Sequence, residues 1–328
     1  MHSNILAIAI STYNRPIILF KNLTKMLPDI RLNKIPIYIS DDSNNNDTRA
    51  VIEILQQQYE FIFYRKNEKQ LGHDANFIES LTWPKSKYIW YLGDSMYFEP
   101  DTLNFILKVI ESDPDFIFVN SHGGRAKYEN GPIKNTMDFF EKTSWHLTLS
   151  GCTIYSNRFC EWLKTTDSSV LKYQNFVQLG SIFEYYSIFQ GKIYWAAAVI
   201  VETNKDKISY WQHNAIKVFA YDWGRAIEFA PIFTSDQKKS VIQSHARNTG
   251  LFGVKNLFSL RAEGAYSSSI YCKYKNEIRE AIIIPPWVAF FISIIPQWLA
   301  KIMVTFVKNS RDRCNELNFR ILNKQNCK

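Results

Sequence analysis

Residues Tyr88 to Pro100 read YIWYLGDSMYFEP and pass from an apolar, β-like run into a Gly-Asp-Ser turn, after which Pro100 suits the first turn of a helix. An acidic residue at the end of a buried strand is well placed to hold a metal ion or another polar ligand. Metal sites usually contain more than one carboxylate, however, and Asp94 is the only acidic residue of this turn. The chemistry of the turn therefore depends on what surrounds Asp94.

The chain on either side of this stretch alternates short apolar runs with helix-like segments. The apolar runs are rich in Ile, Phe and Tyr and fall at Ile5–Ile10, Ile35–Ser40, Phe61–Tyr64, Tyr88–Leu92 and Phe116–Val119. Runs that are apolar on both faces suit strands that are covered on both sides. The helix-like segments lie between them, at Pro16–Leu27, Thr48–Gln58, Asp74–Leu81 and Pro100–Ile110. This alternation predicts an α/β fold with a mostly parallel central sheet.

The pattern loosens in the second half of the chain. We expect a strand near Leu147–Tyr155, helices at Asn157–Leu163 and Gln174–Phe189, and a strand at Ile193–Val201. From Asn214 to about Arg279 the sequence is mainly helix-like. These patterns predict an α/β domain over 1–230, with halves 1–120 and 121–230, and a helical C-terminal region over 231–328.

Composition limits the partners and the compartment. The chain of 328 residues has a formal net charge of +8 and a pI near 9.0, which favours an anionic partner. Its five cysteines, an odd number without a CxxC pair, indicate free thiols in a reducing compartment rather than a disulfide framework or a zinc site. We recognise no basic, cleavable leader around Asn4–Ile10 and therefore expect a cytoplasmic protein.

An apolar segment, 281–308, stands apart from the rest of the C-terminal region. Ala281–Val307 reads AIIIPPWVAFFISIIPQWLAKIMVTFV and is interrupted by Pro285, Pro286 and Pro296. Its tryptophans, and a tail with seven Lys or Arg against two acids over Lys301–Lys328, suit an amphipathic segment at an anionic membrane surface. Two alternatives stay open: a buried helical hairpin, and a true membrane span of about 20 residues.

Polar and charged residues follow each of the first four apolar runs. They are Ser11–Arg15, Asp41 with Asp42, Arg65–Asn67, and Gly93–Ser95. Because parallel strands end at one edge of a sheet, where folds of this class bind ligands, we expect one site there. Asp41 or Asp42 can accept hydrogen bonds from a base or a ribose, and Arg15, Arg65 and Lys66 can face phosphates. Each residue alone fits an ordinary polar loop equally well.

Common catalytic and phosphate-binding motifs are missing from the sequence. There is no GxxxxGK[ST] loop and no GxGxxG, which weakens kinase-like and dinucleotide-binding interpretations. HExxH and GxSxG are absent as well. Because the basic residues are not accompanied by a recognisable nucleic-acid-binding module, we expect no nucleic-acid partner.

Four pieces of the sequence, taken in order, resemble one enzyme family. AIAISTYNRP (7–16), YISDDSNNND (38–47), LGHDANF (71–77) and YIWYLGDSMYFEPD (88–101) resemble the nucleotide-sugar-binding half of family 2 glycosyltransferases, in a style closest to bacterial abequosyltransferase-like enzymes of O-antigen or capsule assembly. The resemblance covers Ile5–Asn120 and implies a GT-A fold and a hexosyl- or deoxyhexosyltransferase. It also implies that Thr12, Tyr13 and Arg15 line the nucleotide pocket and that one of Asp41 and Asp42 reads the base. Together with the residues at the strand ends, we therefore predict these donor-binding residues: Thr12, Tyr13, Arg15, Asp41, Asp42, Arg65, Lys66, His73, Gly93 and Ser95.

The metal motif is where this chain departs from that family. The family typically carries Asp-x-Asp, which binds the diphosphate through Mg²⁺ or Mn²⁺, whereas this chain has Asp94-Ser95-Met96. A thioether is a poor ligand for a hard cation. Three interpretations are open. Asp94 holds the metal with phosphates and waters; or Arg15, Arg65, Lys66, Lys69 or His73 neutralise the diphosphate without metal; or the protein binds a nucleotide sugar or glycan without catalysis.

An inverting transfer also needs a base to deprotonate the acceptor hydroxyl. The resemblance places this base in the second half, near the start of a helix, and Glu184 is the only acid of LGSIFEYYSIFQG (179–191). We therefore predict Glu184 and Asp94 as catalytic residues, although an exposed charge on an amphipathic helix explains Glu184 equally well. Alternative bases are Asp138 and Asp222, and candidates for stacking on the acceptor sugar are Trp145, Trp211 and His213.

The resemblance finally implies an acceptor. Acceptors of such enzymes are commonly saccharides on a polyprenyl diphosphate at the cytoplasmic leaflet, in the synthesis of bacterial surface polysaccharides. A membrane-docking segment would raise the effective concentration of such an acceptor. We therefore expect a cytoplasmic protein that is peripherally bound to the inner leaflet of the plasma membrane.

Overall fold

The computed structural model describes residues 4–121, 123–166, 168–207 and 211–307. The chain divides into two compact units, Met1–Ile208 with Arg225–Val241 and Ser209–Gly224 with Ile242–Lys328. The domain boundary expected at residue 230 falls inside the segment Arg225–Val241 of the first unit. The expected donor-binding residues and Glu184 belong to the first unit, whereas Trp211, His213 and Asp222 belong to the second.

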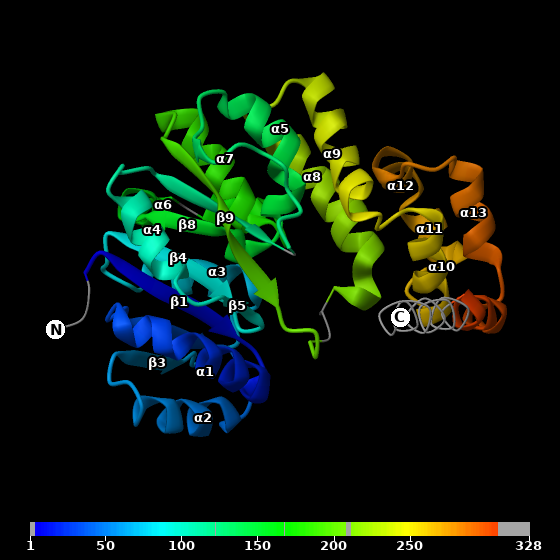
Figure 1. Cartoon of the computed structure of the whole chain (residues 1–328). Helices are drawn as coiled ribbons and strands as arrows, with labels where there is room; N and C mark the ends of the chain where they lie inside the picture. The colour runs from blue at the N-terminus through cyan, green and yellow to red at the C-terminus, as the bar shows by residue number, and fades with distance from the viewer. Residues whose placement is uncertain (1–3, 122, 167, 208–210, 308–328) are drawn as a thin grey trace, which may run out of the picture. The chain divides into compact units, whose positions relative to one another are not determined.

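One sheet forms the centre of the first unit (Figure 1). Within the described ranges its strands are β1 (Leu6–Thr12), β2 (Ile37–Asp41), β3 (Ile62–Lys66), β4 (Tyr88–Gly93), β5 (Met96–Phe98), β6 (Phe116–Ser121), β7 (Gly131–Pro132), β8 (Thr153–Ser156) and β9 (Ile193–Thr203). Their order is β3-β2-β1-β4-β8-β6-β9-β5, with β7 paired to β9. Strands β1 and β4 are apolar on both faces and almost fully buried, as expected for strands with helices on both sides.

The sheet is mixed, which corrects the prediction of a mostly parallel one. β1 pairs in parallel with β2 and β4, and β2 with β3, but β8 pairs antiparallel with both β4 and β6. β9 runs parallel to β6, so β1 to β4, β6 and β9 all end at one edge, while β5, β7 and β8 run the opposite way. The sequence pattern did not predict that β8 runs antiparallel to its neighbours, because an apolar run fits a strand of either direction.

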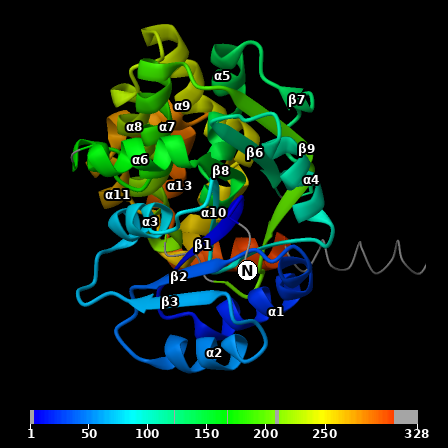
Figure 2. The ribbon, with the colours of Figure 1, turned by 90° about the vertical axis from the view of Figure 1, so that its left-hand side faces the viewer.

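Helices cover both faces of this sheet (Figure 2). One face carries α1 (Pro16–Leu32) and α4 (Thr102–Ile110), and the other carries α3 (His73–Thr82), α6 (Asn157–Thr165) and α7 (Val177–Phe189). The other helices with residues in the first unit are α2 (Asp47–Gln56), which lies beside α1 and β3, α5 (Thr136–Leu147), α8 (Trp223–Phe229) and α9 (Ser235–Thr249). Helix α8 begins in the second unit, and α9 continues into it. The five expected strands and four expected helices of the first 120 residues are therefore confirmed.

The second half was predicted less completely. The strand expected near 147–155 is wrong in its first part, because α5 continues to Leu147 and a 3-10 turn occupies Ser150–Cys152 before β8. Helix α5 was not predicted, although Asn135 caps it by accepting a hydrogen bond from the Asp138 amide at 3.1 Å. The short strands β5 and β7 were not predicted either.

The second unit is helical in its described part, as predicted. It contains α10 (Val254–Glu263), α11 (Ser268–Lys273), α12 (Lys275–Ala281), α13 (Pro286–Ile294) and a helix at Gln297–Val307. None of the described helices is alone long and apolar enough to cross a membrane, and α13 and Gln297–Val307 meet that test only as a pair bent by 108°. Trp287 and Trp298 on this pair are 67% and 63% exposed. The basic residues expected over 308–328 lie outside the described part of the chain.

Candidate functional site

Asp94 lies in the turn between β4 and β5 and is held by residues from β1 and α1. Its Oδ2 accepts a hydrogen bond from Thr12 Oγ1 at 3.1 Å, and its Oδ1 lies 3.3 Å from Arg15 Nη1. Its backbone oxygen accepts a hydrogen bond from Asn22 Nδ2 at 2.9 Å. These residues meet because β1 and β4 are parallel neighbours and therefore end together. The strand ends thus converge as predicted, with Asp94 only 6% exposed.

A second cation, Lys207, acts on the same carboxylate. Burial raises the pKa of the Asp94 carboxyl, and the charge of Arg15, the hydrogen bond from Thr12 and the charge of Lys207 oppose that shift. Burial likewise lowers the pKa of the Lys207 ammonium; the charge of Arg15 lowers it further, and the charge of Asp94 opposes both. The three charged groups therefore act on one another, with Asp94 buried and Arg15 and Lys207 partly exposed.

The loop that carries Lys207 is tied to the Asp94 turn. Strand β5 pairs with β9, with Met96 opposite Thr203. Directly after β9, the Asn204 amide donates to the Ser95 backbone oxygen at 2.8 Å, and Asn204 Nδ2 donates to Asn22 Oδ1 at 3.1 Å. Lys207 therefore follows a short segment whose start is fixed on the turn.

Met96, at the second aspartate position of the family motif, faces the core. Its side chain is 5% exposed, and a Cβ built on Gly151 would lie 2.3 Å from the Met96 sulfur. Among the described residues, no group of three His, Cys, Asp or Glu side chains is arranged to hold a metal ion. Both oxygens of Asp94 already accept hydrogen bonds from this chain. These residues do not fit a metal site built by the protein.

The two aspartates that follow β2 have different surroundings. Asp42 Oδ1 accepts hydrogen bonds from Asn67 Nδ2 at 2.9 Å and the Leu71 amide at 2.8 Å, and its Oδ2 accepts one from the Gly72 amide at 2.9 Å. Asp42 therefore fastens the loop between β3 and α3 to the sheet.

Asp41, by contrast, is fully buried and has a hydroxyl as one of its partners. Its Oδ1 accepts from the Ser43 amide at 2.9 Å and its Oδ2 from the Tyr64 hydroxyl at 2.8 Å. A hydroxyl can rotate and also accept a hydrogen bond, so Asp41 is the one of the two whose surroundings can adjust to a ligand.

The other expected cations have local partners. Arg65 donates to the backbone oxygen and the carboxylate of Glu79, at 2.8 and 3.0 Å, and lies over the Trp83 ring. Lys66 donates to the Asn45 backbone oxygen at 2.6 Å. His73 opens α3, and its Nδ1 lies 2.9 Å from Asp74 Oδ1. Their roles toward a donor remain predictions.

The remaining expected donor-site positions surround the same turn. Tyr13 is 45% exposed just after β1. Gly93 ends β4, and Ser95 is buried and uses its backbone oxygen to hold Asn204. Lys69 is exposed in the loop between β3 and α3.

Glu184, the expected base, lies in α7 and forms an ion pair. Its Oε1 is 2.7 Å from Lys172 Nζ and accepts a hydrogen bond from the Tyr173 hydroxyl at 2.5 Å. The alternative bases are paired too: Asp138 with Lys142 at 2.7 Å and Asp222 with Lys217 at 2.8 Å.

The candidates for stacking on the acceptor are divided between the units. Trp145 is buried in α5 and donates to the Lys142 backbone oxygen at 2.8 Å. Trp211 packs edge-on against Phe219, and His213 lies in a 3-10 turn, both in the second unit.

Lys207, Asn22 and Asn204 were missed by the sequence analysis. Asn22 lies inside α1, and no local signal marks it. Lys207 follows β9, which ends at the same edge as β1 to β4; the sequence predicted this strand but not its direction, so the pattern alone did not place Lys207 at the site.

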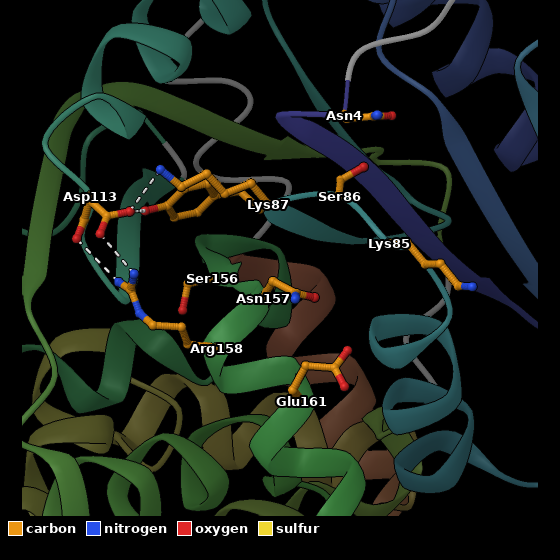
Figure 3. Close-up of a pocket in the computed structure, with 10 residues that line it drawn as sticks. Asn4, Lys85, Ser86, Lys87, Asp113, Ser156, Asn157, Arg158 and Glu161 are labelled. Atoms are coloured by element: carbon orange, nitrogen blue, oxygen red, sulfur yellow. Dashed lines mark hydrogen bonds and ion pairs between the residues drawn. The ribbon is translucent and has the colours of Figure 1, made fainter.

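A cavity of about 640 Å³ lies at the opposite edge of the sheet (Figure 3). It is lined by Asn4 before β1, Lys87 before β4, Asp113 before β6 and residues at the end of the antiparallel β8. Two ion pairs lie in its lining, since Asp113 lies 3.0 Å from Lys87 and 2.8 Å from Arg158. These ion pairs brace the amino-terminal ends of the strands, away from the Asp94 turn.

Part of this chain is similar in sequence to known glycosyltransferases. Residues 7–161 match glycosyl transferase family 2. Abequosyltransferase RfbV of Salmonella typhimurium is 30% identical over 113 residues, which are 34% of this chain and 34% of that protein. The match therefore spans about a third of that relative's own length.

Two solved structures share the fold at low sequence identity. The S. aureus TarS 1–349 complex with UDP-GlcNAc has a TM-score of 0.54 at 12% identity and covers 84% of this chain and 81% of that one. Mannosyltransferase PcManGT from Pyrobaculum calidifontis, in complex with GDP-Man and Mn²⁺, has a TM-score of 0.52 at 13% identity and covers 95% of this chain and 88% of that one. The fold is GT-A-like, and residues 7–161 form a domain that matches glycosyl transferase family 2.

Proposed function

We propose that this protein is an inverting glycosyltransferase that takes a hexosyl or deoxyhexosyl group from a nucleotide-sugar donor. The observation that carries the proposal is the convergence of Thr12, Arg15 and Asp94 at the carboxyl edge of the sheet in a family 2 domain. That edge is where ligands of such folds bind. The relatives point the same way, since TarS was solved with UDP-GlcNAc and PcManGT with GDP-Man.

The transfer exchanges one bond at the anomeric carbon. The acceptor oxygen forms a bond to that carbon on the face opposite the nucleoside diphosphate, whose bond to the carbon breaks with its electron pair. The acceptor proton passes to a base, and cations stabilise the charge that develops on the departing diphosphate. In this scheme Asp41 reads the base, Arg15 faces the diphosphate and Asp42 shapes the loop beside the nucleotide.

Glu184 is the proposed base, and its ion pair defines a test. The contacts from Lys172 and Tyr173 both fall on Oε1 and hold the carboxylate in one orientation. If Glu184 is the base, Glu184→Gln lowers kcat by at least 100-fold and leaves the Kd of the nucleoside diphosphate unchanged. A variant with unchanged kcat and a lower melting temperature would assign Glu184 to structure alone.

The acceptor we propose is a saccharide on a polyprenyl diphosphate, used for bacterial surface polysaccharide, with the protein at the inner leaflet of the plasma membrane. The support is the exposed apolar face of α13 and Gln297–Val307, which includes Trp287, Phe291 and Trp298 at 60 to 67% exposure. Co-sedimentation with vesicles that contain phosphatidylglycerol tests it. Trp287→Ser with Trp298→Ser should weaken binding at least 10-fold, whereas Ile54→Ser, which removes an exposed apolar side chain from α2, should not.

A second candidate is a non-catalytic protein that binds nucleotide sugars or glycans, favoured by the buried Met96 in place of a carboxylate. Calorimetric titration with UDP, GDP, CDP and dTDP tests the donor site that both candidates share. Turnover of the matching nucleotide sugar with a lipid-linked acceptor then separates them. If none of the four diphosphates binds, the donor-site assignment fails.

A further inference from the structure

We propose that this donor site neutralises the diphosphate with Arg15 and Lys207, held in place by Asp94, and requires no divalent cation. The inference rests on the proposed function, because it names the groups that meet the donor. It assigns Lys207 a binding role and makes Asp94 a positioning residue instead of a metal ligand.

The first step of the argument concerns the carboxylate. A divalent cation at Asp94 would compete with Thr12 for one oxygen and with the Arg15 guanidinium, 3.3 Å away, for the other. Mg²⁺ and Mn²⁺ prefer several oxygen ligands, but the described residues offer no cluster of three acidic, histidine or cysteine side chains. The cation would also enter the field of two positive side chains, which opposes its binding.

The second step concerns the residue that replaced the family's other aspartate. Met96 packs against Gly151, in a place where a Cβ on the glycine would lie 2.3 Å from the sulfur and 3.6 Å from Val201. This packing seats β5 against β9, and the pairing ends at Thr203, one residue before Asn204 is fixed on the turn. The apolar side chain therefore helps to hold the segment that carries Lys207, so Met96 and Lys207 belong to one local structure.

The third step concerns the cations themselves. Arg15 keeps 25% of its side chain exposed, so a ligand can reach it. Lys207 is partly buried, and the charge of Arg15 lowers the pKa of its ammonium, so the two like charges repel each other and a bound anion relieves that repulsion. Asp94 offers one negative charge to the two cations, which leaves the site attractive to a diphosphate. A guanidinium also matches phosphate oxygens in two-pronged hydrogen bonds.

Calorimetric titration of the full chain with nucleoside diphosphates, in EDTA and in Mn²⁺, tests the inference. We expect the diphosphate that binds to have a Kd in EDTA within about threefold of its Kd in Mn²⁺. Lys207→Met, which keeps the apolar stem, and Arg15→Met should each raise the Kd in EDTA about 10-fold or more, as expected for loss of a charge-assisted hydrogen bond. Lys205→Met in the same loop is the matched control and should stay within twofold.

For Asp94→Asn, the metal-free site and a metal site predict different changes in the Kd of the diphosphate. Asparagine keeps hydrogen-bonding groups beside Thr12 and Arg15 but removes the negative charge. If Asp94 only positions cations, the Kd in EDTA stays equal or falls; if Asp94 holds a metal, binding in Mn²⁺ weakens. Circular dichroism of each variant establishes that it is folded.

The outcomes separate the inference from the function on which it rests. Binding that is lost in EDTA and restored by Mn²⁺ overturns the metal-free site and leaves the glycosyltransferase proposal intact. An unchanged Kd in Lys207→Met overturns the role of Lys207. The absence of binding in both buffers overturns the donor site itself.

Discussion

Replacing Asp42 by asparagine should release the loop between β3 and α3, while the same change at Asp41 should not. Both Asp42 oxygens face N–H donors, from Asn67, Leu71 and Gly72. Asparagine turns one oxygen into an NH₂ group, which must then face an N–H whichever way the amide lies. At Asp41 one oxygen faces the Tyr64 hydroxyl, which can accept a hydrogen bond from the new NH₂ group.

The size of the effect follows from these contacts. Asp42→Asn loses at least one hydrogen bond to a charged acceptor, worth about 1.5–3 kcal/mol. In addition, the new NH₂ group faces an N–H donor of the loop, and neither donor is then satisfied. We expect the free energy of opening this loop to fall by about 3 kcal/mol, which corresponds to roughly 150-fold faster exchange of the Leu71 and Gly72 amides. Asp41→Asn should change that exchange by less than about threefold.

Hydrogen–deuterium exchange of peptides that cover 67–76, read by mass spectrometry, measures this local opening without assuming that the two units unfold together. Nucleoside diphosphate binding is the second readout, since Asp41→Asn should raise the Kd by removing the group that reads the base. Equal exchange in Asp42→Asn and the unmodified chain would refute the anchoring argument. Loop opening in Asp41→Asn as large as in Asp42→Asn would refute the distinction between the two carboxylates.

Two further expectations concern stability. Gly180→Ala should lower the melting temperature, because the added Cβ would lie 2.0 Å from the buried Tyr173 ring. Gly224→Ala should raise the melting temperature, because its Cβ would meet nothing within 4 Å and alanine is favoured over glycine in a helix. Shifts of the same sign in the two variants would contradict this reasoning. Burial lowers the pKa of His245 from 6.5 to about 3. Between these two pH values the imidazole gains a proton in the unfolded chain but not in the folded one. The free energy of unfolding therefore falls as the pH is lowered from 6.5 toward 3. We expect a loss of about 2 kcal/mol between pH 7 and pH 5 in urea titrations, absent in His245→Leu, and a pH dependence that survives in this variant would show that other groups cause it.

The first 120 residues could be predicted from sequence because each element there carries its own signal. Strands β1 and β4 are apolar on both faces and buried, and their pairing brings Thr12 and Asp94 together without further information. Pro16 stands at the start of α1, as its fixed backbone angle requires. Local signals and tertiary structure agree in this part, so reasoning from pattern reached the carboxyl edge correctly.

The partner of each side chain could not be predicted in the same way. Arg65 follows β3 as expected, yet it folds back onto Glu79 of α3, a residue that is remote from the strand-end pattern. Asp42 accepts hydrogen bonds from the backbone amides of a loop whose conformation the sequence does not specify. A strand-end rule gives the edge where a residue lies, whereas its side-chain contacts depend on loops and helices that arrive from elsewhere.

The direction of the strands in the second half could not be predicted from the sequence. This direction decides whether Lys207 lies at the same edge of the sheet as Asp94. The apolar run at Ile193–Val201 fits a strand of either direction, and only its parallel register with β6 places its end beside the Asp94 turn. β8 fixes that direction in turn, because it runs antiparallel to both β4 and β6 and so makes β6 parallel to β4. Had β9 run the other way, the segment 204–207 would lie at the edge of the Asp113 cavity, and Asp94 would have Arg15 as its only cation. The four-residue strand β8, whose direction the sequence pattern did not predict, is therefore what brings the second cation to the site.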